Sequence, residues 1–153
     1  MIDIKKRLEL YLKEAFVHIQ RLEDVLEPLN KIYPLDSDKY EILEDDYKDK
    51  LDVLAFRFSK LQDLLGSKIF RAYLESAGFV VEEKSFNELL KELEKEKILD
   101  IDLWSEFRGI RNAIAHDYPY DYTQKIEAIN YLIANVKKLI YITKNIRQKS
   151  ETF

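Results

Sequence analysis

The sequence contains no cysteine, and only two histidines, three glycines and three prolines occur among its 153 residues. Without cysteine, a disulfide framework and a cysteine-ligated metal site are excluded, and two histidines cannot form a histidine-rich metal cluster. No stretch approaches the roughly 18 apolar residues of a membrane span, and the N-terminal segment lacks the apolar core of a signal peptide. We therefore expect a cytoplasmic protein that requires neither a metal nor another cofactor.

The chain also lacks a strong excess of charge of either sign. Its formal net charge is −4 and its isoelectric point is near 5.4, unlike proteins that coat nucleic acid through bulk attraction. Any contact with RNA must therefore be local. The segment 123–153 is locally basic, with six basic and two acidic residues. It could serve as a basic arm, but the solvated face of a surface helix explains the same pattern.

Apolar residues recur at spacings of three and four in every long segment, which is the period of helices. The scarcity of glycine and proline leaves these segments long. Hydrophobic residues make up 46% and charged residues 35% of the chain, the balance of an ordinary globular domain. The sequence predicts a single all-α domain over residues 1–153, folded as an antiparallel helical bundle of four main helices and a short one.

Proline, glycine and capping residues bound the first two predicted helices. The first helix covers about residues 3–27, after which Pro28 and Pro34 bound a loop. Asp38, with a glutamate three residues later, suits the capped start of a long second helix. That helix should end near Gly78.

Gly66 lies inside the second helix, where it marks a bend or a close packing contact, or is simply tolerated. Ser85 and Glu88 have the spacing of a capping box, which predicts the start of a short, charged helix that ends near Lys97.

Asp100 or Asp102 can cap the next helix, and Pro119 disfavours helical geometry at the residue before it. That helix should therefore stop around residues 116–118. Thr123 can cap the last long helix.

The helix that begins near residue 103 has two distinct faces. Four apolar residues at spacings of four and three should face the core: Leu103, Phe107, Ile110 and Ile114. Four small or polar residues share a second face that points away from it: Ser105, Gly109, Asn112 and His116. Arg111 lies at the margin between the two. Since serine and glycine allow another helix to approach closely, a homodimer could close over the second face.

Arg111 and His116 are the residues on this helix with useful chemistry. Arginine carries a permanent forked charge that suits phosphate, and histidine exchanges a proton near neutral pH. In RNA cleavage, a neutral histidine could accept the 2′-hydroxyl proton while arginine stabilises charge on the phosphate. Considered alone, an arginine and a histidine at a helix end are more often a cap, a dipole partner or part of a surface salt bridge.

The segment 111–118 reads Arg-Asn-Ala-Ile-Ala-His-Asp-Tyr. It resembles the motif of HEPN-domain ribonucleases, in which arginine is followed by a polar residue and, after four to six intervening positions, by histidine. It is most similar to the HepT-like toxins, whose motif continues with a tyrosine two residues after the histidine and whose partners are minimal nucleotidyltransferases. The all-α layout and the place of the motif before the last long helix extend the resemblance over most of the chain.

The resemblance implies roles for four residues. Arg111 and His116 would be catalytic, Asn112 would orient the site, and Tyr118 would be the residue that the nucleotidyltransferase antitoxin modifies with AMP. Tyr120 and Tyr122 follow closely and are less favoured alternatives for this modification. The segment 57–63, Arg-Phe-Ser-Lys-Leu-Gln-Asp, also resembles a polar, aromatic stretch of such proteins, and the roles of Arg57 and Asp63 stay open.

The leading hypothesis is a metal-independent endoribonuclease toxin that cleaves RNA at a homodimer cleft and is inactivated by AMPylation. The alternative is a non-catalytic HEPN protein that binds a nucleotidyltransferase or presents substrate to it, and a third is a purely structural helical module. A proton carrier beside a phosphate ligand favours the first, because a docking surface has no need of either. His18 is predicted to be a structural or surface residue.

Overall fold

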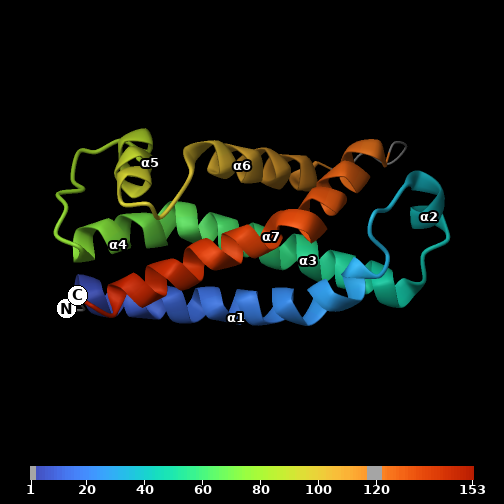
Figure 1. Cartoon of the computed structure of the whole chain (residues 1–153), viewed down its shortest axis with the longest axis horizontal. Coiled ribbons are helices and arrows are strands. Elements are labelled where there is room, and N and C mark those ends of the chain that lie inside the picture. Colours follow the sequence, from blue (N-terminus) through green and yellow to red (C-terminus); the bar gives the residue numbers. More distant parts are fainter. Residues whose placement is uncertain (1–2, 117–121) are drawn as a thin grey trace.

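The computed structural model describes residues 3–116 and 122–153, and every secondary-structure element within these ranges is a helix (Figure 1). The predicted all-α class is therefore confirmed. In chain order, the elements are α1 (Ile4–Asn30), α2 (Ser37–Glu41), α3 (Asp45–Leu64), the π-helical turn η1 (Leu65–Ile69), α4 (Phe70–Ser76), α5 (Phe86–Lys95), α6 (Ile101–Ala115) and α7 (Thr123–Ser150). In the described part of the chain, no helix is both long and apolar enough to cross a membrane.

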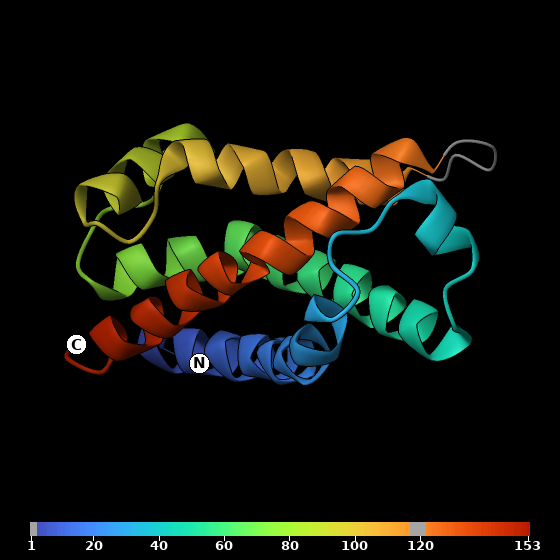
Figure 2. The same cartoon turned by 45° about the vertical axis from the view of Figure 1, so that its right-hand side comes forward.

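The long helices run back and forth along the longest axis of the molecule. Helix α3, continued by η1 and α4, returns along α1, and α7 returns from the far end of α6 across both (Figure 1). The turned view shows the same order and places the short α2 at the end of the molecule where α7 begins (Figure 2). All of the long helices contribute to one hydrophobic cluster, in which Phe58, Phe70 and Phe107 are among the largest fully buried side chains.

Helix α1 is longer than the sequence predicts. Asp3 caps its start through a hydrogen bond from the Lys6 backbone N–H at 2.8 Å, and the helix continues through Pro28 to Asn30 rather than ending near residue 27. Proline removes one hydrogen bond from a helix, but Leu29 in the same turn is fully buried. Packing of the last turn against the core therefore outweighs the local preference.

The predicted second helix is interrupted near its start. Asp36, and not Asp38, caps the short α2 by accepting from the Lys39 N–H at 2.8 Å. Helix α2 ends at Glu41, and α3 starts at Asp45. The residues between them include neither glycine nor proline, so the break has no local signal. It lies where α2 contacts the start of α7, with the ring centroids of Tyr40 and Tyr122 5.2 Å apart.

The rest of the predicted second helix follows the prediction, and its packing explains Gly66. Helix α4 ends at Ser76, and Gly78 follows with a φ of 98°, a left-handed conformation that favours glycine. Gly66 lies in η1, where the chain gains a residue in one turn. A Cβ atom on Gly66 would lie 3.0 Å from Cζ2 of Trp104. Of the alternatives for this glycine, close packing is therefore the one that the structure supports.

The caps of α5 and α6 are predicted correctly, although α6 begins at Ile101 rather than near residue 103, and the cap of α7 is not. Ser85 and Glu88 form the predicted capping box, and the Asp100 carboxylate accepts from the backbone N–H groups of Asp102 and Leu103. Thr123, in contrast, is the first residue inside α7, and its N-cap position is occupied by the preceding tyrosine. The chain enters α7 one residue earlier than a threonine cap requires.

Candidate functional site

The segment that starts at Arg111 occupies the C-terminal end of α6. Ala115 is the last helical residue, one position before the predicted stop around residues 116–118. His116 has extended backbone angles, φ −89° and ψ 130°, and its N–H donates to the carbonyl oxygen of Ala113 at 3.3 Å. The histidine therefore sits where the chain leaves the helix, with its residue exposed to solvent.

Helix α6 is rotated slightly from the predicted orientation. Phe107 is fully buried, but Leu103, Ile110 and Ile114 are only half-buried, and Trp104 is the other buried residue of the helix. The Trp104 ring packs edge-on against a phenylalanine of α4, with ring centroids 4.8 Å apart. Because α6 packs against α3, α5 and α7, its buried line shifts toward Trp104, a contact that periodicity alone does not reveal.

The second face of α6 is exposed, as predicted. Its four members are all accessible to solvent: Ser105, Gly109, Asn112 and His116. A Cβ atom built on Gly109 would meet no atom of the described residues within 4 Å. The face is thus open enough for a second helix to approach closely.

Asp63 of α3 holds Arg111 in one orientation. The Arg111 Nε–H donates to Asp63 Oδ1 at 3.2 Å, and an Nη2–H donates to Oδ2 at 3.1 Å. The two side chains are 30% and 51% exposed, respectively, and an ion pair in such a setting contributes at most about 1 kcal/mol to stability. The planar, two-bond geometry instead restricts the rotation of the guanidinium.

Arg111 borders a groove of about 530 Å³ between η1 and α6. The residues that line it are Gln62, Asp63, Gly66, Ser67, Phe86, Trp104, Arg108, Arg111 and Asn112. Phe86 and Trp104 supply an aromatic wall, with ring centroids 6.4 Å apart, and the two arginines place positive charge on its border. The groove therefore has cations at its edge, which suit an anionic phosphate, and an apolar floor in which Trp104 is only 2% exposed.

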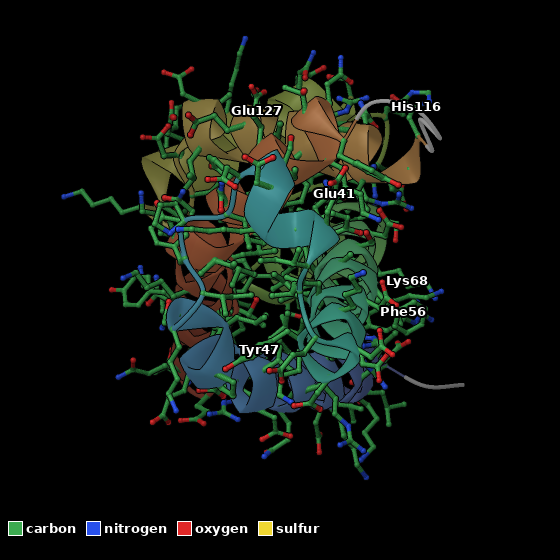
Figure 3. The ribbon with its side chains drawn as sticks, turned by 90° about the vertical axis from the view of Figure 1, so that its right-hand side faces the viewer. Glu41, Tyr47, Phe56, Lys68, His116 and Glu127 are labelled. Atoms are coloured by element: carbon green, nitrogen blue, oxygen red, sulfur yellow. The ribbon has the colours of Figure 1, made fainter. Side chains whose placement is uncertain are left out.

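His116 lies just after the end of α6, four residues beyond Asn112, and is not among the residues that line the groove. Figure 3 shows it at one edge of the molecule, on the same side as Phe56 and Lys68. On an ideal helix, five residues correspond to about 7.5 Å of rise and about 140° of rotation, but His116 has already left the helix with extended backbone angles. The structure thus brings Arg111 together with Asp63 and Asn112 and places His116 at the exit of the same helix.

Arg57 and His18 form a second polar pair that the sequence did not predict. An Arg57 Nη1–H donates to His18 Nδ1 over 3.1 Å, which requires the histidine to be neutral with its proton on Nε2. Burial, and secondarily the charge of Arg57, lowers the pKa of His18 below its ordinary value. His18 is buried on α1, consistent with its predicted structural role.

Of the tyrosines named as modification sites, Tyr118 and Tyr120 lie outside the described residues. Tyr122 is described, with 37% of its surface exposed at the N-cap position of α7. Its ring contacts Tyr40 of α2. The described geometry therefore bears only on the last of the three candidates.

Asp63 is the site residue whose role stayed open in the sequence analysis. It ends the segment 57–63 and lies 48 residues from Arg111 along the chain. In the sequence, Asp63 is simply an acidic residue on an exposed helical face, and such residues are common on any surface helix. Its pairing with Arg111 depends on how α3 and α6 pack together, which the sequence does not show.

The comparisons with known proteins return no relative. No family model matches the chain, and no match is found among the curated proteins or the solved structures.

Proposed function

We propose that the chain is a metal-independent endoribonuclease, a HEPN-type toxin of the HepT-like group with a HEPN-like antiparallel bundle. The observation that carries this proposal is the arginine of the motif, whose guanidinium is oriented by Asp63 at the edge of a groove with an aromatic wall. A histidine follows at the exposed end of the same helix. Arginine for phosphate and histidine for the proton are the groups that metal-free RNA cleavage needs.

The reaction is a displacement at phosphorus. Neutral His116 accepts the proton of a ribose 2′-hydroxyl, and the 2′-oxygen forms a bond to the neighbouring phosphorus atom. The bond from phosphorus to the 5′-oxygen breaks, and that oxygen takes a proton from water while His116 returns its proton to the solvent, so the products are a 2′,3′-cyclic phosphate and a 5′-hydroxyl. Arg111 stabilises the negative charge on the phosphate oxygens during the attack. Asn112, on the same helix face as His116, orients the site.

Asp63 is a positioning residue in this scheme. A guanidinium has five N–H donors, and Asp63 uses two of them. Among the described residues, this leaves three donors of Arg111 for a phosphate group. An oriented arginine loses less conformational freedom when phosphate binds than one that is free to rotate.

The reacting pair is completed by a second copy of the chain. Between Arg111 and the helix exit at His116, an ideal helix turns by about 140°, so the two residues start from different sides of α6. A symmetric homodimer across the exposed face of α6 would bring the residues of two copies to one cleft. Among the residues that the structure describes, none lies within 4 Å of a Cβ atom on Gly109, which supports this arrangement.

Control by a nucleotidyltransferase antitoxin belongs to the same proposal. AMP on Tyr118, two residues after His116, would bring a phosphate that competes with RNA for Arg111, and an adenosine that blocks the ribose. The alternative is a HEPN protein without activity that binds a nucleotidyltransferase or presents substrate to it.

The test is RNA cleavage by purified protein and two variants. We expect Arg111→Ala and His116→Ala each to reduce the cleavage rate by about 10²–10⁴-fold, the contribution of one positioned catalytic group, with unchanged helical circular dichroism. Arg21→Ala is the matched control, since Arg21 is an exposed arginine of α1 in a surface ion pair with Asp24. Its rate should equal that of the wild type.

Two results would contradict the proposal. A wild-type protein that binds a nucleotidyltransferase but leaves RNA intact supports the alternative function. Full activity of His116→Ala would show that His116 is not the proton acceptor. In an active protein, Asp63→Asn should lower the rate less than Arg111→Ala does, because the amide keeps the shape of the carboxylate but loses its charge and one of its two acceptor oxygens.

A further inference from the structure

An exposed aromatic residue on the outer face of α3 has two cations over its ring. Phe56 has 53% of its surface exposed. The guanidinium carbon of Arg57 lies 5.3 Å from the centre of the Phe56 ring, and the Lys60 Nζ lies 5.5 Å from it. Both distances fall within the range of cation–π contact. We call these three residues the Phe56 platform.

The platform continues into the candidate site along one row of the helix. Phe56, Lys60 and Asp63 follow spacings of four and three, so they share a face of α3, and each is exposed. At 1.5 Å per residue, Phe56 lies about 10 Å along the axis from Asp63. Asp63 is the residue that orients Arg111. A ligand held at Arg111 can therefore extend along α3 onto the platform.

A hydrogen bond to the buried His18 holds Arg57 in one orientation. Its Nη1–H donates to Nδ1 of the buried His18 over 3.1 Å. The lowered pKa of His18 keeps that nitrogen available as an acceptor. The guanidinium beside Phe56 is thus held before any ligand arrives, and little rotational freedom remains to be lost when an anion binds.

The surroundings of Phe56 suit a nucleic acid better than a protein. The other members of its exposed row are polar or charged: Asp52, Lys60, Asp63 and Ser67. A protein interface needs a contiguous apolar centre, which this row does not provide. An aromatic face with cations beside it matches a base joined to a phosphate. Asp52, one turn before Phe56, repels phosphate and so limits the platform at that end.

We propose that the Phe56 platform binds a nucleotide of single-stranded RNA next to the cleaved bond, with the base stacked on Phe56 and the phosphate contacted by Arg57 and Lys60. This proposal rests on the proposed ribonuclease function and adds a binding subsite to it. The platform holds the strand while Arg111 and His116 act on the neighbouring phosphate. It contributes to affinity rather than to the chemical step.

The test measures the affinity of the wild-type protein for a fluorescently labelled 2′-O-methyl RNA, which lacks the free 2′-hydroxyl that the reaction uses. Loss of the stacked base in Phe56→Leu should raise Kd by about 5- to 150-fold, whereas Phe56→Tyr, which keeps the ring, should stay near the wild type. The matched control is Tyr141→Leu, because Tyr141 is another exposed aromatic residue, 69% accessible on α7. Its affinity should be unchanged.

A second measurement tests the phosphate contact. The plot of log K against log salt should lose about 0.7 of its slope in Lys60→Ala, the value for one phosphate of a single strand. If the protein binds and cleaves RNA but Phe56→Leu and Lys60→Ala bind it like the wild type, the platform proposal is wrong and the ribonuclease proposal stands. If the wild type neither binds nor cleaves RNA, both are wrong. A Phe56→Leu variant with changed oligomeric state and unchanged RNA affinity would identify a protein interface and overturn the platform.

Discussion

The two helical glycines provide a test of how Trp104 is packed beside the groove. In Gly66→Ala, the new methyl group would lie 3.0 Å from Cζ2 of Trp104 and 3.8 Å from Cζ of Phe86. In Gly109→Ala, it would meet nothing within 4 Å in the described part of the chain. Both substitutions add one methyl group inside a helical segment, so their difference isolates the contact with Trp104.

The expected magnitudes follow from these distances. Replacing glycine by alanine inside a helix stabilises a protein by roughly 0.5–1 kcal/mol. Gly109→Ala should show this gain. Trp104 is 2% exposed and packs against two phenylalanines, so its ring cannot shift freely. Overpacking of such a site costs roughly 1–3 kcal/mol, and Gly66→Ala should therefore be less stable than Gly109→Ala by about that amount.

The assay is thermal unfolding followed by circular dichroism. For a chain of this size, each kcal/mol corresponds to about 2–4 °C in Tm. Both variants must be compared in the same oligomeric state, because Gly109 lies on the proposed dimer face. If Gly66→Ala melts at or above the temperature of Gly109→Ala, Trp104 is not packed against η1 as described. The position of the Trp104 ring in the groove would then be wrong.

Three further predictions concern stability, assembly and control. Since the pKa of His18 is lowered, the unfolded chain binds more protons than the folded one below pH 6.5, so the free energy of unfolding should fall as the pH drops through this value. In His18→Gln, the free energy of unfolding, measured by chemical unfolding over the same pH range, should lack the part of the pH dependence that His18 causes. Equal slopes of this free energy against pH for both proteins would contradict the prediction. Gly109→Leu should dissociate the proposed dimer in sedimentation, whereas Val17→Leu, at an exposed residue of α1, should not; a wild type that is monomeric at micromolar concentration would refute the interface. Mass spectrometry after co-expression with a nucleotidyltransferase should find AMP on Tyr118, and Tyr118→Phe should escape inhibition while still cleaving RNA. Fully inhibited protein with no adduct on Tyr118, Tyr120 or Tyr122 would show that inhibition works by docking alone.

The sequence by itself determined the helical class and several helix ends. The capping box of Ser85 and Glu88, the cap at Asp100 and the stop at Gly78 were predicted correctly, because each depends on residues within a few positions of one another. The exposed face of α6 was predicted for the same reason, since the period of the helix relates its members. Local interactions and periodicity are fully present in a linear sequence.

The tertiary structure alone decided the features that depend on which helices meet. The break between α2 and α3 has no local signal and lies where α2 meets the start of α7. The Asp63–Arg111 pair joins residues 48 positions apart, and the Phe56 platform acquires its fixed cation from a histidine on another helix. Ion pairs between distant residues depend on how the helices are rotated and crossed, and those angles result from packing of the whole core rather than from any one segment.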